Sequence, residues 1–224
     1  MKLRFSFIDN EIVFDNSYVN VLEVENKKYF YRIVENLISA NEGLSDDIMF
    51  FSSENDEIPF NNNIKILIDY FNIDFDNKKY ITEINKKVTN LLDDSVKNTI
   101  NVSYKKIYQL MKKVIDEIDV PLIINEQIDI ESVIKLLKIS INYKNDLLEN
   151  LLLLIDVEKT LKVNKMLVFI NLKQYLTNAE LIELYKYAIY NGVIILLVDS
   201  QSYGICNEYE KKLIIDNDLD EFVL

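Results

Sequence analysis

A block of acidic side chains in the middle of the sequence has the composition of a cation site. Between Ile115 and Glu131 there are six acids and no lysine or arginine: Asp116, Glu117, Asp119, Glu126, Asp129 and Glu131. Calcium binds about six to eight oxygen atoms and tolerates irregular loops, whereas magnesium demands a stricter octahedron. The block therefore favours calcium over magnesium. A second interpretation is that these acids form a solvated surface and that Asp129 caps the following helix.

Lysines lie on both sides of the acidic block and could bind phosphate. From Lys97 to Lys113 every charged residue is a lysine, and Lys135, Lys138 and Lys144 follow the acids. Lysines bound to duplex phosphates release counterions, so they could outweigh the net charge of -12 locally. Lys135 and Lys138, three residues apart, are expected to share one helix face. Equally, the lysines could serve solubility.

Several kinds of catalytic site are excluded by composition. The chain has no histidine, which removes Ser-His-Asp, Cys-His and histidine-metal chemistry. Its single cysteine, Cys206, cannot form an intrachain disulfide and is expected to be a small buried hydrophobe in a reducing compartment. The segment Val24–Lys28 has the position of a phosphate-binding loop but lacks its glycines, and Glu23 and Glu25 would repel a triphosphate. We therefore do not expect ATP hydrolysis.

Two weaker metal patterns are incomplete, and no membrane segment is expected. Asp216–Asp220 has the initial acidic spacing of an EF-hand, but Glu221 replaces the glycine, so it is interpreted as a solvated acidic tail. A carboxylate-metal nuclease stays an alternative, although neither Pro59 nor Pro121 is followed by an acid. No apolar run approaches the roughly 20 residues of a membrane helix. A cytoplasmic protein is expected.

The two ends of the chain predict an α/β fold. Leu3–Phe7 and Ile12–Phe14 predict an antiparallel pair, and a strand Tyr18–Val24, a helix Lys27–Ala40 and a strand Ile48–Phe51 predict a β-α-β unit. Later, Met166–Ile170 and Val193–Val198 predict buried strands on either side of a helix with a Thr177–Glu180 capping box. Apolar strands that alternate with helices indicate a parallel sheet covered on both faces.

The middle of the chain predicts a helical insertion. From Ile64 to about Leu161 the periodicity is almost wholly helical, and one apolar stripe runs from Val96 to Ile118, long enough for about six turns. Each end of the chain supplies only part of a sheet, so an insertion fits better than two sequential domains. The expected organisation is an α/β head from 1–60 and 161–224 with a helical leg, 61–160, inserted into it.

Five segments, in their order and spacing, resemble the short form of the CRISPR-associated Csn2 family over nearly the whole chain. They are Leu3–Phe7, Val19–Glu23, the acidic stretch Glu117–Glu131 running into Ile134–Leu137, Leu167–Asn171 and Tyr175–Thr177. The resemblance implies an ATPase-like α/β head without a functional phosphate loop, an inserted helical leg and a ring-shaped homotetramer. It also implies binding of double-stranded DNA ends through a lysine-lined channel, calcium ions that hold the ring, and no catalysis.

By this resemblance the calcium role falls on Glu117, Asp119, Glu126, Asp129 and Glu131. The channel role falls on Lys28, Lys135, Lys138 and Lys144. The implied partners are the CRISPR integrase complex and the effector nuclease during spacer acquisition. Two alternatives from other classes stay open, a carboxylate-metal nuclease and a protein-only interaction scaffold.

Overall fold

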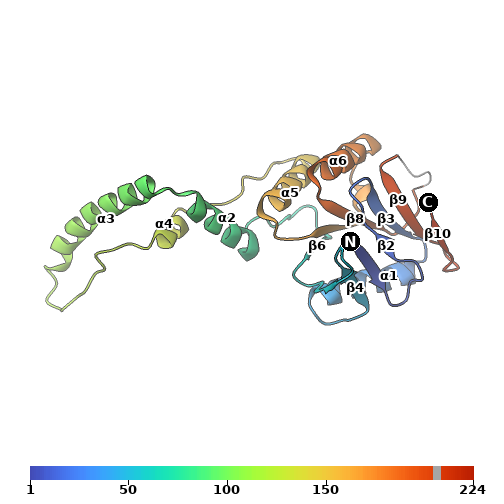
Figure 1. The fold of residues 1–224 in the computed structure, drawn as a ribbon, viewed down its shortest axis with the longest axis horizontal. Helices are drawn as coiled ribbons and strands as arrows, with labels where there is room; N and C mark the ends of the chain where they lie inside the picture. The colour runs from blue at the N-terminus through green and yellow to red at the C-terminus, as the bar shows by residue number, and fades with distance from the viewer. Residues whose placement is uncertain (204–207) are drawn as a thin grey trace. The chain divides into compact units, whose positions relative to one another are not determined.

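The computed structural model describes residues 1–203 and 208–224. They form two units, which we call the main unit, Met1–Asp74 with Tyr143–Leu224, and the helical unit, Phe75–Asn142 (Figure 1). The helical leg was expected at 61–160, but 61–74 and 143–160 of that range belong to the main unit. Cys206, expected to be buried, lies outside the described residues.

The main unit is built on a six-stranded sheet of order β10-β9-β3-β8-β7-β6. Its first five members from the β6 edge are parallel: β6 (Ile64–Leu67), β7 (Met166–Ile170), β8 (Ile194–Asp199), β3 (Val19–Val24) and β9 (Glu210–Ile215). The edge strand β10 (Glu221–Val223) is antiparallel to β9. Every residue of β3 and β7 is buried, and for β7 the continuous apolar run predicted this.

Helices cover this sheet on both faces. Figure 1 shows α1 (Lys27–Asn41) on one side and α5 (Leu147–Leu161) with α6 (Asn178–Asn191) on the other. Asn26 caps α1, and Asp146 caps α5. The predicted capping box of Thr177 and Glu180 is present at the start of α6, and Gly192 ends that helix in the left-handed conformation. A short 3-10 helix, η1 (Leu172–Gln174), follows β7.

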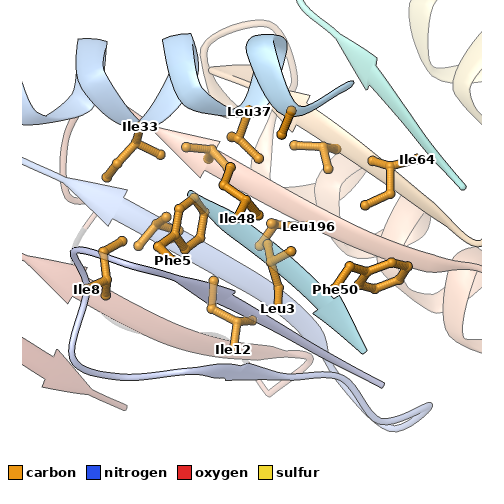
Figure 2. Packing of buried hydrophobic residues seen from close by; sticks show 14 of the residues in the cluster. Leu3, Phe5, Ile8, Ile12, Ile33, Leu37, Ile48, Phe50, Ile64 and Leu196 are labelled. Carbon is orange, nitrogen blue, oxygen red and sulfur yellow. The ribbon is translucent and has the colours of Figure 1, made fainter. Parts of the chain in front are cut away.

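A second sheet of order β2-β1-β4-β5 covers α1 and the adjacent face of the main sheet. It comprises β1 (Lys2–Phe5), β2 (Ile12–Val13), β4 (Ile48–Phe51) and β5 (Glu57–Ile58), all paired antiparallel. Figure 2 shows Phe5 and Phe50 of this sheet packed with Ile33 and Leu37 of α1 and with Leu196 of β8. The expected β-α-β unit is therefore wrong, because β4 pairs with β1 instead of joining the sheet of β3.

The acidic sequence near the end of the chain was interpreted as a solvated tail: Asp218 and Asp220 are exposed, as expected, but the segment forms a turn between two strands and is not a tail. The Asp216 Oδ1 atom accepts hydrogen bonds from the backbone N–H groups of Asp218 and Asp220, both at 2.9 Å. Leu219 has a φ of 72°, and the turn joins β9 to β10. The Asp216 carboxylate therefore has a structural role in this hairpin.

The helical unit contains α2 (Lys78–Leu91), α3 (Asp94–Ile115) and the short α4 (Ile130–Leu136). Helix α2 packs against α4. The structure describes all 22 residues of helix α3, and none of them is buried. Its apolar stripe follows the predicted positions, although Ile118 lies beyond its end. No described helix is both long and apolar enough to cross a membrane.

Candidate functional site

Three of the five expected calcium ligands make hydrogen bonds or ion pairs inside the helical unit. Asp129 caps α4 by accepting from the backbone N–H groups of Glu131 and Ser132, at 3.4 and 3.1 Å. Glu131 lies 3.9 Å from the Lys135 ammonium, one helical turn further on. Glu126 accepts a hydrogen bond of 3.2 Å from the hydroxyl of Tyr108. Capping by Asp129 was the alternative interpretation of this residue, and it agrees with the structure.

The acidic residues are exposed and are not gathered into a cluster. Glu117 and Asp119 lie between α3 and α4, and all five expected ligands are solvent-exposed. Within 1–203 and 208–224 no group of three or more acidic or cysteine side chains is placed to hold a metal ion. Calcium requires several oxygen atoms on one centre, so the acids in this arrangement do not fit the ion.

The expected DNA-binding lysines are exposed and belong to both units. Lys28 lies in the first turn of α1 and Lys144 precedes α5, so both belong to the main unit. Lys135 lies on α4, but that helix ends at Leu136, and Lys138 has a left-handed φ of 48°. The expectation that Lys135 and Lys138 share a helix face is therefore wrong. Helix α4 is too short to carry both.

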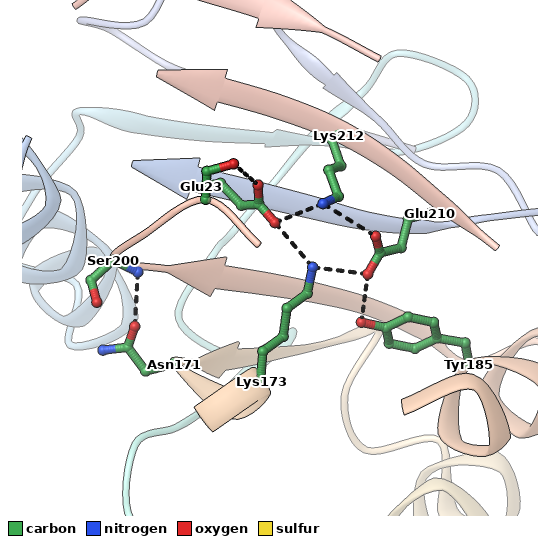
Figure 3. A network of polar contacts seen from close by, with 8 residues as sticks. Glu23, Asn171, Lys173, Tyr185, Ser200, Glu210 and Lys212 are labelled. Carbon is green, nitrogen blue, oxygen red and sulfur yellow. Dashed lines mark hydrogen bonds and ion pairs between the residues drawn. The ribbon is translucent and has the colours of Figure 1, made fainter. Parts of the chain in front are cut away.

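A buried ring of four charges in the main unit was not predicted from the sequence. Lys173 of η1 lies 3.1 Å from Glu23 of β3 and 2.8 Å from Glu210 of β9. Lys212 of β9 lies 2.9 Å from Glu23 and 3.5 Å from Glu210. Figure 3 shows the alternating arrangement of the two ammonium and two carboxylate groups. We call these four residues the charge ring.

Hydroxyl groups complete the hydrogen bonding of the charge ring. Tyr185 of α6 donates to Glu210 at 2.9 Å, and Ser202 donates to Glu23 at 3.0 Å. Burial opposes ionisation of Glu23, but hydrogen bonds and attraction from Lys212 and Lys173 outweigh it and lower the pKa of this carboxyl. The ring therefore links strands β3 and β9 to η1, α6 and the segment after β8.

The sequence contains one signal for this ring. Glu23 and Asp199 each stand near the carboxyl end of an otherwise mostly apolar buried strand. A charge in such a strand needs a partner, because an isolated buried charge is costly. Glu23 was expected only to repel a triphosphate, and its burial was not foreseen: its exposed fraction is 0%. Which residues pair with it could not be inferred, because Lys173 and Lys212 are distant in sequence.

A cavity lies beside the charge ring, between α6 and β9. Its volume is about 170 Å³, and it is lined by Lys173, Asn178, Leu181, Ile182, Tyr203, Glu210 and Lys212. The connection from β3 to α1, where a nucleotide-binding fold would place a phosphate loop, consists of Glu25 and Asn26. The Asn26 side chain accepts from the backbone N–H groups of Lys28 and Tyr29, so these two donors already have an acceptor.

Comparison with known proteins agrees with the resemblance seen in the sequence. The family model for CRISPR-associated protein (Cas_Csn2) matches residues 41–219. The fold is similar to that in the crystal structure of Stu0660 of Streptococcus thermophilus, with a TM-score of 0.58 and 10% sequence identity. That alignment covers 100% of this chain and 76% of Stu0660. No protein with a curated description matches the sequence.

Proposed function

Because this chain belongs to the CRISPR-associated Csn2 family, we propose that it is a non-catalytic protein that binds double-stranded DNA ends. In this proposal four copies form a ring with an ATPase-like head and no functional phosphate loop. The ring acts in the cytoplasm during spacer acquisition, together with the CRISPR integrase complex and the effector nuclease. The two-residue connection between β3 and α1, with its capping Asn26, supports a head without nucleotide chemistry.

The observation that carries the proposal is the uncovered apolar stripe of α3. Ile107 is 57% exposed, Met111 49% and Val114 58%, and the three side chains lie on one face of α3. All residues of α3 are described by the structure, and none of them is buried. An apolar stripe of this length is normally covered by another element. A second copy of the chain would supply that cover, which supports a homo-oligomer.

The charges of α3 support a nucleic-acid ligand. Lys105 and Lys112 are seven residues apart and share a face on the opposite side of the helix from Met111 and Ile107. A copy packed on the apolar stripe would leave these lysines accessible to phosphates. No base-reading motif accompanies them, so we expect binding to duplex form rather than to sequence.

Calcium enters this proposal as an ion to be tested. The resemblance assigns it to Glu117, Asp119, Glu126, Asp129 and Glu131. Those acids are not gathered within the described residues, so no step of the proposed DNA binding is routed through the ion. If calcium binds, the segment between α3 and α4 has to rearrange.

The deciding experiment compares linear duplex with a covalently closed circle of the same sequence, at fixed salt, with calcium and then with chelator. We expect binding of the linear form, weak binding of the circle and no cleavage. Equal binding of both forms contradicts a ring that threads onto ends. Cleavage in magnesium or manganese indicates the nuclease, and absence of DNA binding at low salt under every metal indicates the scaffold.

A matched pair of lysine variants locates the DNA path. Lys135→Ala is expected to weaken duplex binding for all sequences and to reduce the slope of log affinity against log salt by about 1, as for loss of one phosphate contact. Lys165→Ala removes the same charge from an exposed position before β7 and serves as the control. An unchanged slope for Lys135→Ala removes this lysine from the DNA path.

A further inference from the structure

Asp199 is a buried acid beside the charge ring that the proposed DNA binding does not use. It is the last residue of β8, and its exposed fraction is 0%. In the parallel pairing of β3 and β8 it lies directly opposite Glu23. Two carboxyl groups from neighbouring strands therefore approach each other inside the main unit.

Neither carboxylate oxygen of Asp199 accepts a well-formed hydrogen bond from a described residue, although the backbone N–H of Lys173 lies close enough to favour the ionised form slightly. The charge ring is neutral by itself, because its two lysines balance its two glutamates. An ionised Asp199 would add an uncompensated negative charge to this buried region, which is costly without a partner. A buried carboxyl group without a partner usually binds a proton, a water molecule or an ion.

The groups that face Asp199 come from every neighbouring element. Lys173 of η1 attracts its negative charge, whereas Glu23 of β3 and Glu210 of β9 repel it. Three tyrosines, Tyr70, Tyr185 and Tyr203, also lie within its electrostatic reach. Burial is the largest influence, and together with the two glutamates it outweighs Lys173 and raises the pKa of Asp199 to about 7.

We propose that Asp199 is a proton-controlled latch for strand β9, whose Glu210 and Lys212 belong to the charge ring. With the proton bound, the charge ring stays neutral and Ser202 keeps its hydrogen bond to Glu23. When the proton leaves, the Asp199 carboxylate competes with Glu23 and Glu210 for the Lys173 ammonium. The ion pair between Lys173 and Glu210 of β9 then weakens. The latch is independent of DNA binding.

The sign of the pH dependence follows from proton binding. The Asp199 carboxyl binds its proton more tightly in the folded chain than in the unfolded chain, whose reference pKa is 3.8. Its stabilising contribution is therefore complete below pH 3.8 and is lost as the pH rises towards about 7. Above that range folded and unfolded chains both carry the ionised group, and no further change is expected from this residue.

The first experiment compares the full chain with Asp199→Asn, which keeps the shape of the side chain and cannot ionise. Between pH 4 and 7 the unfolding equilibrium of the wild type should shift towards the unfolded chain by about tenfold per pH unit relative to this variant. Equal pH dependence in the two proteins overturns the proposal. Potassium or sodium dependence of the difference also overturns it, because a cation and not a proton would then neutralise Asp199.

The second experiment separates a latch from a merely structural acid. Carbon NMR of labelled aspartate should show the Asp199 carboxyl titrating near pH 7 in the folded wild type. Over the same range, amide exchange corrected for its intrinsic pH dependence should accelerate in β9, at Lys212 and Leu213, but not in β7. Asp199→Asn should keep β9 protected at pH 8. Titration without any change in β9 exchange contradicts the latch.

Discussion

The main unit and the helical unit differ in how far they bury their apolar side chains. Strands β3 and β7 are buried at every position, and helices cover both faces of their sheet. The helical unit buries Phe75, Tyr80 and Ile134, whereas every residue of α3 remains accessible in the described chain. The main unit thus buries its apolar strands within one chain, whereas the helical unit leaves the apolar stripe of α3 accessible.

This difference separates two uses of charge. In the main unit, four charges are paired in an apolar interior, where loss of one partner is expensive. In the helical unit, pairs such as Lys112 with Asp116 are exposed, and exposed pairs contribute little. The buried ion pairs therefore stabilise the packing of the main unit, whereas the exposed charged side chains of the helical unit remain accessible to a ligand.

The largest expected effect comes from removing one member of the charge ring. Lys212→Met should destabilise the main unit by about 3–5 kcal/mol, because Glu23 and Glu210 would then compete for one remaining lysine. Urea unfolding measures this change. Glu23→Gln combined with Lys212→Met should recover a large part of the loss. A cost below about 1 kcal/mol for Lys212→Met would contradict the contrast with exposed pairs.

A smaller effect is expected from one leucine in each unit. Leu154→Ala, at a fully buried position of α5, should cost about 2–5 kcal/mol, since it removes packed atoms and leaves a cavity. Leu110→Ala, at a position of α3 that is 64% exposed, should change the stability of the monomer by no more than about 0.5 kcal/mol. Both are measured by denaturant unfolding at high dilution. Equal costs would mean that α3 is already covered within one chain.

A third effect depends on calcium and concerns the acids that follow α3 and begin α4. If calcium binds there, a concentration of 100 times its Kd should stabilise the native protein by about 2.7 kcal/mol, and Asp119→Ala with Glu131→Ala should abolish that gain. Thermal unfolding with calcium and with chelator measures it. Asp46→Ala with Glu54→Ala removes two exposed acids from the main unit and is the control. If calcium still stabilises the variant with Asp119→Ala and Glu131→Ala, the assignment of these residues as calcium ligands is contradicted.

Sequence periodicity predicted several strands of the main unit, among them the four-residue β4 with its observed bounds, but missed others. Met166–Ile170 was identified with its observed bounds, because a continuous apolar run between polar turns is typical of a buried parallel strand. The four-residue strand β6 was missed within a stretch interpreted as helical. A short apolar run has no period of its own, and only its register with β7, where Ile64 lies opposite Met166, defines it as a strand.

The candidate sites were predicted less well than the fold. The sequence identified the acidic block because its residues are adjacent, and Asp129 was recognised as a possible cap from its position before Ile130. For the charge ring it offered only an acid in a mostly apolar strand, Glu23, and not the partners of that acid, which come from η1 and β9. Pairing between distant residues depends on strand order, which periodicity does not contain.

Strand order also has a consequence for synthesis on the ribosome. Strand β3 emerges early, but both of its neighbours in the sheet, β8 and β9, are translated near the end of the chain. Its backbone donors and acceptors have no partner strand until then, and its apolar side chains are exposed to aggregation. The antiparallel pairing of β1 with β2 and β4 can form long before the main sheet closes. Folding of the main unit should therefore be late, slow and dominated by non-local contacts.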